Sequence, residues 1–159
     1  MRSDGATMTQ VFTPRDPDYR RRVSGIFDNA PFVRHLGARL EEIAPGECRT
    51  SLAIGTMHMQ HDGVVHAGVQ ATLADHTAGC AAASLIEAGR RVLTAEFKIN
   101  LLRAASGATL ECHAKVLRPG RSLIVVESEV FAAAGGTRQL VSKATVTLAV
   151  VDAAAAGSR

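Results

Sequence analysis

Hydrophobic and polar residues alternate along most of the second half of the chain, with the period of a β-strand that buries one face. The strongest run, residues 92–102, sets large apolar side chains on one face against charged and amide side chains on the other. Residues 36–54 form two shorter runs around Pro45 and Gly46, which predicts a hairpin. Further runs, separated by Pro-Gly and Gly-Gly pairs that favour turns, cover residues 109–117, 121–131 and 138–151.

One long stretch breaks this alternation, because alanine and other small residues dominate residues 66–88. Small side chains let a helix lie close to a sheet that curls around it. A shorter helix is predicted before Pro31, with Asp16 or Asp18 as its cap and Arg20–Arg22 on a solvated face. Together these elements predict an α+β domain in which an antiparallel sheet packs on one long helix.

Neither end of the chain has a hydrophobic period that could bury a face. We therefore expect residues 1–16 to form a flexible leader and residues 152–159 a flexible tail. Between them, residues 17–151 are expected to form a single domain. A chain of 159 residues is long enough for this domain.

Composition narrows the possible partners. The formal net charge is +3, but the basic residues are dispersed, and one Tyr with no Trp offers little for base stacking, so no nucleic-acid partner is expected. Three widely spaced cysteines indicate neither a disulfide framework nor a metal knuckle, and favour a reducing, cytoplasmic setting. Residues 1–22 lack the apolar core of a signal peptide, and charges interrupt the most apolar helix, so no membrane association is expected.

Two features of the long helix need one explanation. The stretch His66-Ala67-Gly68 begins it with small residues, so that a carbonyl oxygen or oxyanion can reach the free N–H groups of the first turn. Asp75 places a carboxylate in an otherwise apolar helix, where it needs a partner or a chemical use. Ala67 and Asp75 are separated by about 12 Å of helix, too far to reach one carbonyl. If both serve one reaction, they come from different subunits of a homo-oligomer.

The pattern Q-x-x-G-x-x-H-A-G that begins at Gln60, with the L-A-D that ends at Asp75, resembles the acyl-CoA thioesterases of the hotdog fold. The branch is that typified by the phenylacetate-pathway enzyme. Segments 95–105 and 116–130 are similar to that family's strands, so the resemblance covers residues 32–150. It implies hydrolysis of a small, aromatic or medium-chain acyl-CoA, without metal or cofactor. It also implies a homodimer with shared active sites, paired into a homotetramer.

The resemblance further implies roles for single residues. The backbone N–H of Ala67 stabilises the oxyanion formed from the thioester carbonyl, and Asp75 acts as general base or nucleophile. Gln60 and Thr94 orient the thioester or the attacking water, and His66 lies beside the oxyanion. No Ser-His-Asp set is needed for this chemistry, and the chain has no G-x-S-x-G motif.

Coenzyme A also carries phosphates, which the guanidinium of Arg binds through several donors. Gly68 is a candidate substrate contact because it leaves the start of the helix open. The candidate phosphate ligands, which could equally be ordinary solvated charges at strand ends, are Lys98, Arg103, Arg118, Arg121 and Ser122.

Three alternatives remain open. His58, His61, Asp62, His66 and His76 lie close in sequence and could supply metal ligands, although their spacing matches no zinc-protease motif. The chain could be an acyl-CoA-binding module without catalysis, although it offers no DNA-binding segment. It could also be a hydratase or dehydratase that acts on an acyl thioester. Release of the CoA thiol separates hydrolysis from the last two.

Overall fold

The computed structural model describes residues 11–153, so the predicted leader up to residue 10 and the predicted tail from residue 154 lie outside the described residues. The helices are α1 (Tyr19–Asp28), α2 (Pro31–His35) and α3 (Ala67–Ala83), with a 3₁₀ turn η1 (Thr56–His58). The strands are β1 (Ala38–Ala44), β2 (Glu47–Ala53), β3 (Arg90–Leu101), β4 (Thr109–Pro119), β5 (Leu123–Ala134) and β6 (Thr137–Asp152).

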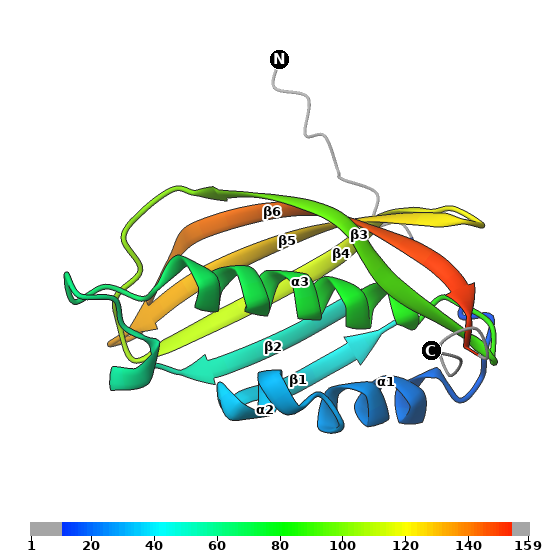
Figure 1. Ribbon diagram of the computed structural model, residues 1–159, viewed down its shortest axis with the longest axis horizontal. Helices are drawn as coiled ribbons and strands as arrows, with labels where there is room; N and C mark the ends of the chain where they lie inside the picture. Colours follow the sequence, from blue (N-terminus) through cyan, green and yellow to red (C-terminus); the bar gives the residue numbers. More distant parts are fainter. Residues whose placement is uncertain (1–10, 154–159) are drawn as a thin grey trace, which may run out of the picture.

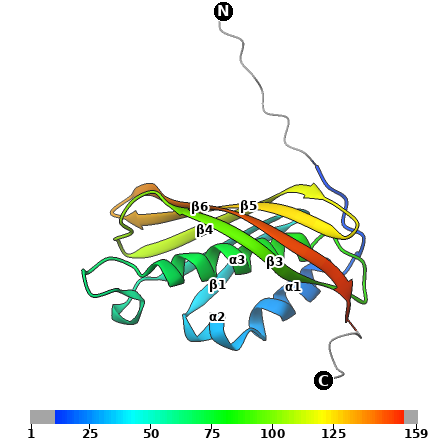
Figure 2. The same ribbon diagram turned by 45° about the horizontal axis from the view of Figure 1, so that its top comes forward.

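The strands form one antiparallel sheet in the order β1-β2-β4-β5-β6-β3. Helix α3 lies along one face of this sheet, and α1 and α2 lie beside α3 and β1 (Figure 1). In the turned view the sheet curls over α3 (Figure 2). The predicted α+β architecture, a long helix wrapped by an antiparallel sheet, is confirmed.

The order of the strands leaves β3 at an edge. The chain crosses from β2 through α3 to β3, which pairs with β6, and then returns to β4 beside β2. Large apolar side chains of β3 stay exposed, with 47% of Leu93, 40% of Phe97 and 51% of Leu101 accessible. An edge that is both unpaired and apolar is a ready surface for another strand.

The predicted hairpin is present, and Gly46 explains its position. Gly46 has a φ of 78°, a conformation that favours glycine after Pro45 in a tight turn. Its N–H donates to the buried Ser84 Oγ at 2.8 Å, which ties the hairpin to the end of α3. A Cβ at this position would lie 2.5 Å from the Phe12 ring, so the turn has no room for a side chain.

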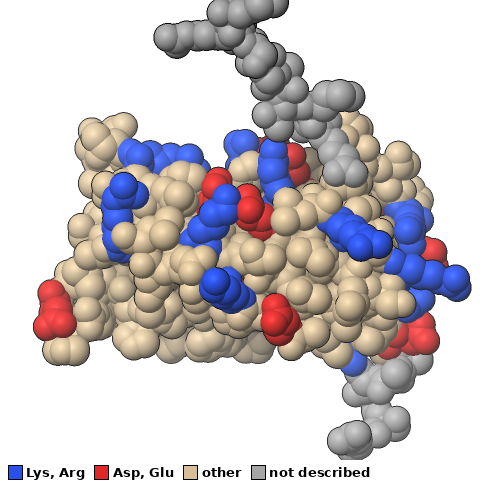
Figure 3. All heavy atoms as spheres, turned by 90° about the horizontal axis from the view of Figure 1, so that it is seen from above, with Lys and Arg blue, Asp and Glu red and all other residues tan. Residues whose placement is uncertain are grey.

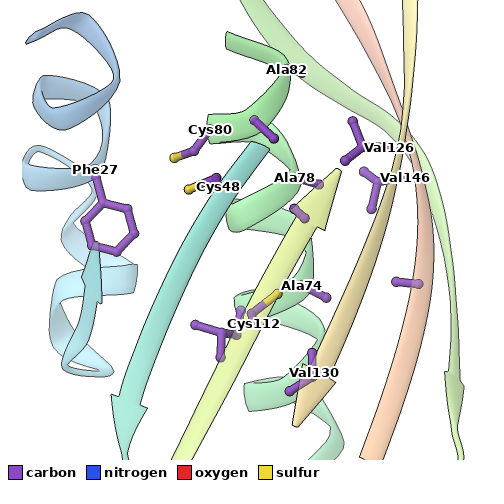
Figure 4. Packing of buried hydrophobic residues seen from close by; sticks show 14 of the residues in the cluster. Phe27, Cys48, Ala74, Ala78, Cys80, Ala82, Cys112, Val126, Val130 and Val146 are labelled. Carbon is purple, nitrogen blue, oxygen red and sulfur yellow. The ribbon is translucent and has the colours of Figure 1, made fainter. Parts of the chain in front are cut away.

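The small residues of α3 pack directly on the sheet. Ala74, Ala78, Ala81, Ala82 and Ala83 are completely buried, and Figure 4 shows several of them against the valines of β5 and β6. Polar atoms at this contact are satisfied in pairs: Ser128 Oγ donates to the Ala74 carbonyl at 2.8 Å, and the Thr50 and Thr77 hydroxyls lie 2.7 Å apart. These bonds fix the position of α3 on the sheet.

The three cysteines belong to the same core. All are free thiols and buried, with Cys48 of β2 beside Cys80 of α3 (Figure 4). Burial raises the pKa of Cys112 to about 12, although Thr77 and Ser128 oppose the shift. The Cys112 thiol is therefore protonated and unreactive in the native protein.

One prediction about α1 is wrong. Arg22 does not lie on a solvated face: its guanidinium donates to the Ala83 and Ile86 carbonyls at 2.7 and 2.8 Å and pairs with Asp16 at 2.7 Å. The last carbonyls of a helix have no partners within the helix, and Arg22 supplies donors for that of Ala83, the last residue of α3, and for that of Ile86 just beyond it. Asp16 is buried and Phe12 packs against the core, so the end of the predicted leader contacts the domain.

The other face of the sheet is charged. On β4, buried residues that face α3 alternate with more exposed polar ones, and Glu111 pairs with Arg138 at 2.8 Å across the sheet. Acidic and basic side chains are interspersed on the face seen in Figure 3. In the described part of the chain, no helix is both long and apolar enough to cross a bilayer.

Candidate active site

The start of α3 is fixed by His66. Its Nδ1 accepts the Gly68 N–H at 2.9 Å, and its carbonyl accepts the N–H groups of Val69 and Gln70 at 3.0 and 3.4 Å. Among residues 11–153, nothing accepts the N–H of Ala67, the first residue of the helix. A free donor at the positive end of a helix is suited to hold a carbonyl oxygen or an oxyanion.

The cap also determines the tautomer of His66. Because Nδ1 accepts a hydrogen bond, the neutral ring carries its proton on Nε2. His66 and Ala67 are both exposed, so two donors are available at the start of the helix.

These residues line a pocket of about 470 Å³, which we call the helix-start pocket. Gln60 and Gln70 contribute to its wall, with Leu101 at the end of β3 and Arg103 in the segment that follows. Of the predicted site residues, the structure therefore brings Gln60, His66, Ala67 and Arg103 together.

Asp75 lies further along α3, in a second pocket of about 380 Å³, the Asp75 pocket. Its Oδ1 accepts a hydrogen bond of 2.8 Å from Thr94 Oγ1 on β3. The other walls are mainly apolar and include Ile26 of α1, Gly79 of α3 and Leu148 of β6. The structure thus brings Asp75 and Thr94 together in a pocket that can hold an apolar group.

His76 lies beside Asp75 with its ring against Phe27, 5.1 Å between ring centroids. Burial lowers the pKa of His76, while the charge of Asp75 opposes the shift. Its Nε2 is buried without a partner among the described residues. His76 is therefore a neutral ring that packs in the wall of the Asp75 pocket.

The two pockets have no residue in common. Eight positions separate Ala67 and Asp75 on α3, about 12 Å along a continuous helix. Within one chain, the donor and the carboxylate cannot contact the same carbonyl group. Helix α3 is unbroken between these two residues, as the sequence predicts.

The candidate phosphate ligands do not lie together. Arg121 lines a third pocket, of about 250 Å³, with Arg15 and Arg90 near the end of α3. Arg118 at the end of β4 and Ser122 on the turn between β4 and β5 are exposed and close to Arg121 in sequence. The other two candidates lie elsewhere, Lys98 exposed on β3 and Arg103 in the helix-start pocket.

The histidines do not gather around a metal position. The buried His58 uses both ring nitrogens, since Nδ1 accepts the Gly55 N–H at 2.8 Å and Nε2 donates to the Leu36 carbonyl at 2.9 Å. His61 is exposed, and its Nε2 lies 3.4 Å from Asp62 Oδ2. Within residues 11–153 no three His, Cys, Asp or Glu side chains are placed to hold a metal ion.

Gln70, Arg15 and Arg90 also line these pockets, and the sequence patterns did not predict them. Gln70 had a signal, because it is a polar residue at a buried position of an apolar helix, one turn beyond Ala67. Arg15 falls in the predicted leader, and only the folded chain shows it beside Arg90 and Arg121.

A family model described as the thioesterase superfamily matches residues 62–138. A thioesterase family protein from Silicibacter pomeroyi is 34% identical, with 84% of this chain and 98% of that chain covered and a TM-score of 0.83. The conserved protein PA5202 from Pseudomonas aeruginosa is 31% identical, with 77% and 94% covered and a TM-score of 0.70. A search of curated proteins gives no significant match.

The PaaI protein of the E. coli phenylacetic acid degradation operon is also similar in fold. Its TM-score is 0.76 at 17% identity, with 84% of this chain and 94% of that chain covered. The chain thus belongs to the thioesterase superfamily, and its helix wrapped by a sheet is the hotdog fold.

Proposed function

We propose that this protein hydrolyses acyl-CoA thioesters with a small, aromatic or medium-chain acyl group, releasing the free acid and CoA. The observation that carries the proposal is the pair of chemical groups on α3: a free N–H at Ala67 and a carboxylate at Asp75 held by Thr94. Thioester hydrolysis needs these two functions, an oxyanion donor and a base or nucleophile.

In the proposed reaction Asp75 takes a proton from water while the water oxygen bonds to the thioester carbonyl carbon. The oxyanion that forms accepts hydrogen bonds from the Ala67 N–H and from His66 Nε2. The carbon–sulfur bond then breaks, and the CoA thiolate leaves and is protonated. As nucleophile instead, Asp75 would first form a mixed anhydride that water then hydrolyses.

We propose a homodimer as the catalytic unit, in which β3 pairs with β3 of a second copy. The exposed apolar edge of β3 supports this. Thr94 lies at the Asp75 pocket and Leu101 at the helix-start pocket. In the proposed antiparallel pair, Thr94 lies opposite Leu101 of the second copy, and the twofold axis passes between Phe97 and Lys98. This register would join the two pockets into one site. The predicted homotetramer would pair two such dimers.

The same register would bring the phosphate candidates together. Arg103 follows β3 and would come opposite Val92 of the second copy, near Arg90 and Arg121 at that end. Arginines from two chains would then surround one CoA, with its phosphates outside and its thioester between the pockets. The buried free thiols support the proposed cytoplasmic setting.

The test is release of CoA thiol from a panel of acetyl-, phenylacetyl-, benzoyl-, medium- and long-chain acyl-CoAs by the wild type and Asp75→Asn. Turnover of one class that falls at least about a hundredfold in the variant supports the proposal. Saturable binding of acyl-CoA without thiol release, equal in both proteins, contradicts it and favours a non-catalytic binding module. Hydration of an unsaturated acyl-CoA without thiol release would favour a hydratase.

A further inference from the structure

Gln70 carries an acceptor atom that the protein leaves unused. Only 3% of the residue is exposed, and its Nε2 donates to the Val65 carbonyl at 3.4 Å. That carbonyl needs a donor, which fixes the orientation of the amide and leaves Oε1 on the other side. In the part of the chain that the structure describes, nothing donates to Oε1.

A buried polar atom without a partner is uncommon and unfavourable, unless a ligand supplies the partner. Gln70 lines the helix-start pocket, three residues after Ala67 and so on the same side of α3. A ligand that bonds to Oε1 must offer a donor. The thioester carbonyl is an acceptor only, so Gln70 Oε1 cannot bind it.

Coenzyme A has a donor at the required place. Two methylene groups separate its sulfur from the first amide N–H of the pantetheine arm. Gln70 lies about 4.5 Å beyond Ala67 along the helix axis, which is about one turn. If the thioester carbonyl lies at the Ala67 N–H, the pantetheine amide lies at about the same distance from Ala67. The lining of the pocket includes the apolar residues Leu101 and Ala105, which suit methylene groups.

We propose that Gln70 Oε1 accepts the first pantetheine amide N–H and so positions the thioester at the Ala67 N–H. Gln70 is then a positioning residue that recognises the carrier, whatever the acyl group. The inference rests on the proposed thioester hydrolysis, because it concerns the same pocket.

The test compares two thioesters with one acyl group. The first is the N-acetylcysteamine thioester, and the second replaces its amide N–H with a methylene group, so that only the donor is lost. For the wild type we expect kcat/KM to favour the amide by about tenfold. Gln70→Leu should reduce that preference to about twofold or less, whereas Gln70→Glu, which keeps an acceptor, should retain it.

Thr72→Val is the matched control, since it removes a polar group from α3 at a position outside the pocket. It should retain the preference. If Gln70→Leu hydrolyses both thioesters with the wild-type ratio, the inference is wrong while the proposed hydrolysis stands. Gln70→Met repeats the comparison should the Leu variant fail to fold.

If the wild type releases no thiol from either compound, the acyl-CoA panel alone decides the proposed function. Binding of the corresponding non-hydrolysable thioethers, measured by calorimetry, then decides the inference by itself. A preference for the amide that Gln70→Leu abolishes supports it, and equal binding by the wild type contradicts it.

Discussion

Thr94 Oγ1 on β3 donates a hydrogen bond of 2.8 Å to Asp75 Oδ1 on α3. This bond joins the edge strand to the helix, so the carboxylate is oriented by the same strand that we propose for the dimer contact. A carboxylate that accepts a hydrogen bond is held in one orientation, which favours reaction over a freely rotating group. The orientation of Asp75 and the integrity of the edge are therefore coupled.

Thr94→Val should lower kcat by about tenfold with little change in KM, because it removes the bond but preserves the side-chain shape. Steady-state kinetics on the preferred acyl-CoA provide the measurement. Thr145→Val, the same change at an exposed position of β6, is the control. Equal kcat in the two variants would show that the bond has no catalytic role.

Phe97→Asp should halve the mass of the assembly, from dimer to monomer or from tetramer to dimer, and abolish turnover, since it places a charge at the centre of the proposed β3 contact. Light scattering after gel filtration measures the mass. Leu117→Asp replaces a similarly exposed leucine on β4, 50% accessible, and should leave the mass unchanged. A Phe97→Asp protein with the same mass as the wild-type assembly would place the contact elsewhere.

Arg22→Ala should destabilise the fold by about 2–4 kcal/mol, because it leaves the Ala83 and Ile86 carbonyls and the carboxylate of Asp16 without their donor. Arg21→Ala is the matched control: its pair with Asp18 is largely exposed, so the change should amount to less than about 1 kcal/mol. Urea denaturation measures both. Similar values for the two variants would mean that Arg22 does not stabilise the end of α3.

The buried His76 predicts a pH dependence of stability. Its folded pKa lies below the ordinary value, so the unfolded chain binds the proton more readily. The contribution of His76 to the free energy of unfolding is complete above the pKa of the unfolded chain, about 6.5, and is lost as the pH falls below that value. His76→Gln should flatten the loss of stability between about pH 7.5 and 5.5 in urea denaturation. A decline parallel to that of the wild type would exclude His76 as its source.

Much of the fold follows from local patterns. Alternation and turn residues predicted the strands, and the small residues of α3 predicted its close packing on the sheet. On β3 the alternation did not translate into burial, because Phe97 and Leu101 lie on an edge strand and stay exposed. Periodicity identifies an apolar face but does not say which surface covers it.

Contacts between distant segments were not predictable in the same way. Arg22 is polar in sequence, yet its long side chain reaches carbonyls more than sixty residues away. The separation of the phosphate candidates likewise depends on strand order. In contrast, the separation of Ala67 and Asp75 follows from helix geometry alone, because both lie on one unbroken helix.

The separation of Ala67 and Asp75 on α3 allows the most direct test of a site shared between two subunits. Ala67 is the first residue of α3, where proline is tolerated, so Ala67→Pro removes the N–H and preserves the helix. Ala67→Pro and Asp75→Ala homodimers should each be inactive. A mixed dimer should regain one of its two sites, with about half the wild-type turnover per dimer. Thiol release by purified mixed dimers that matches this value supports the account, and mixed dimers as inactive as their parents contradict it.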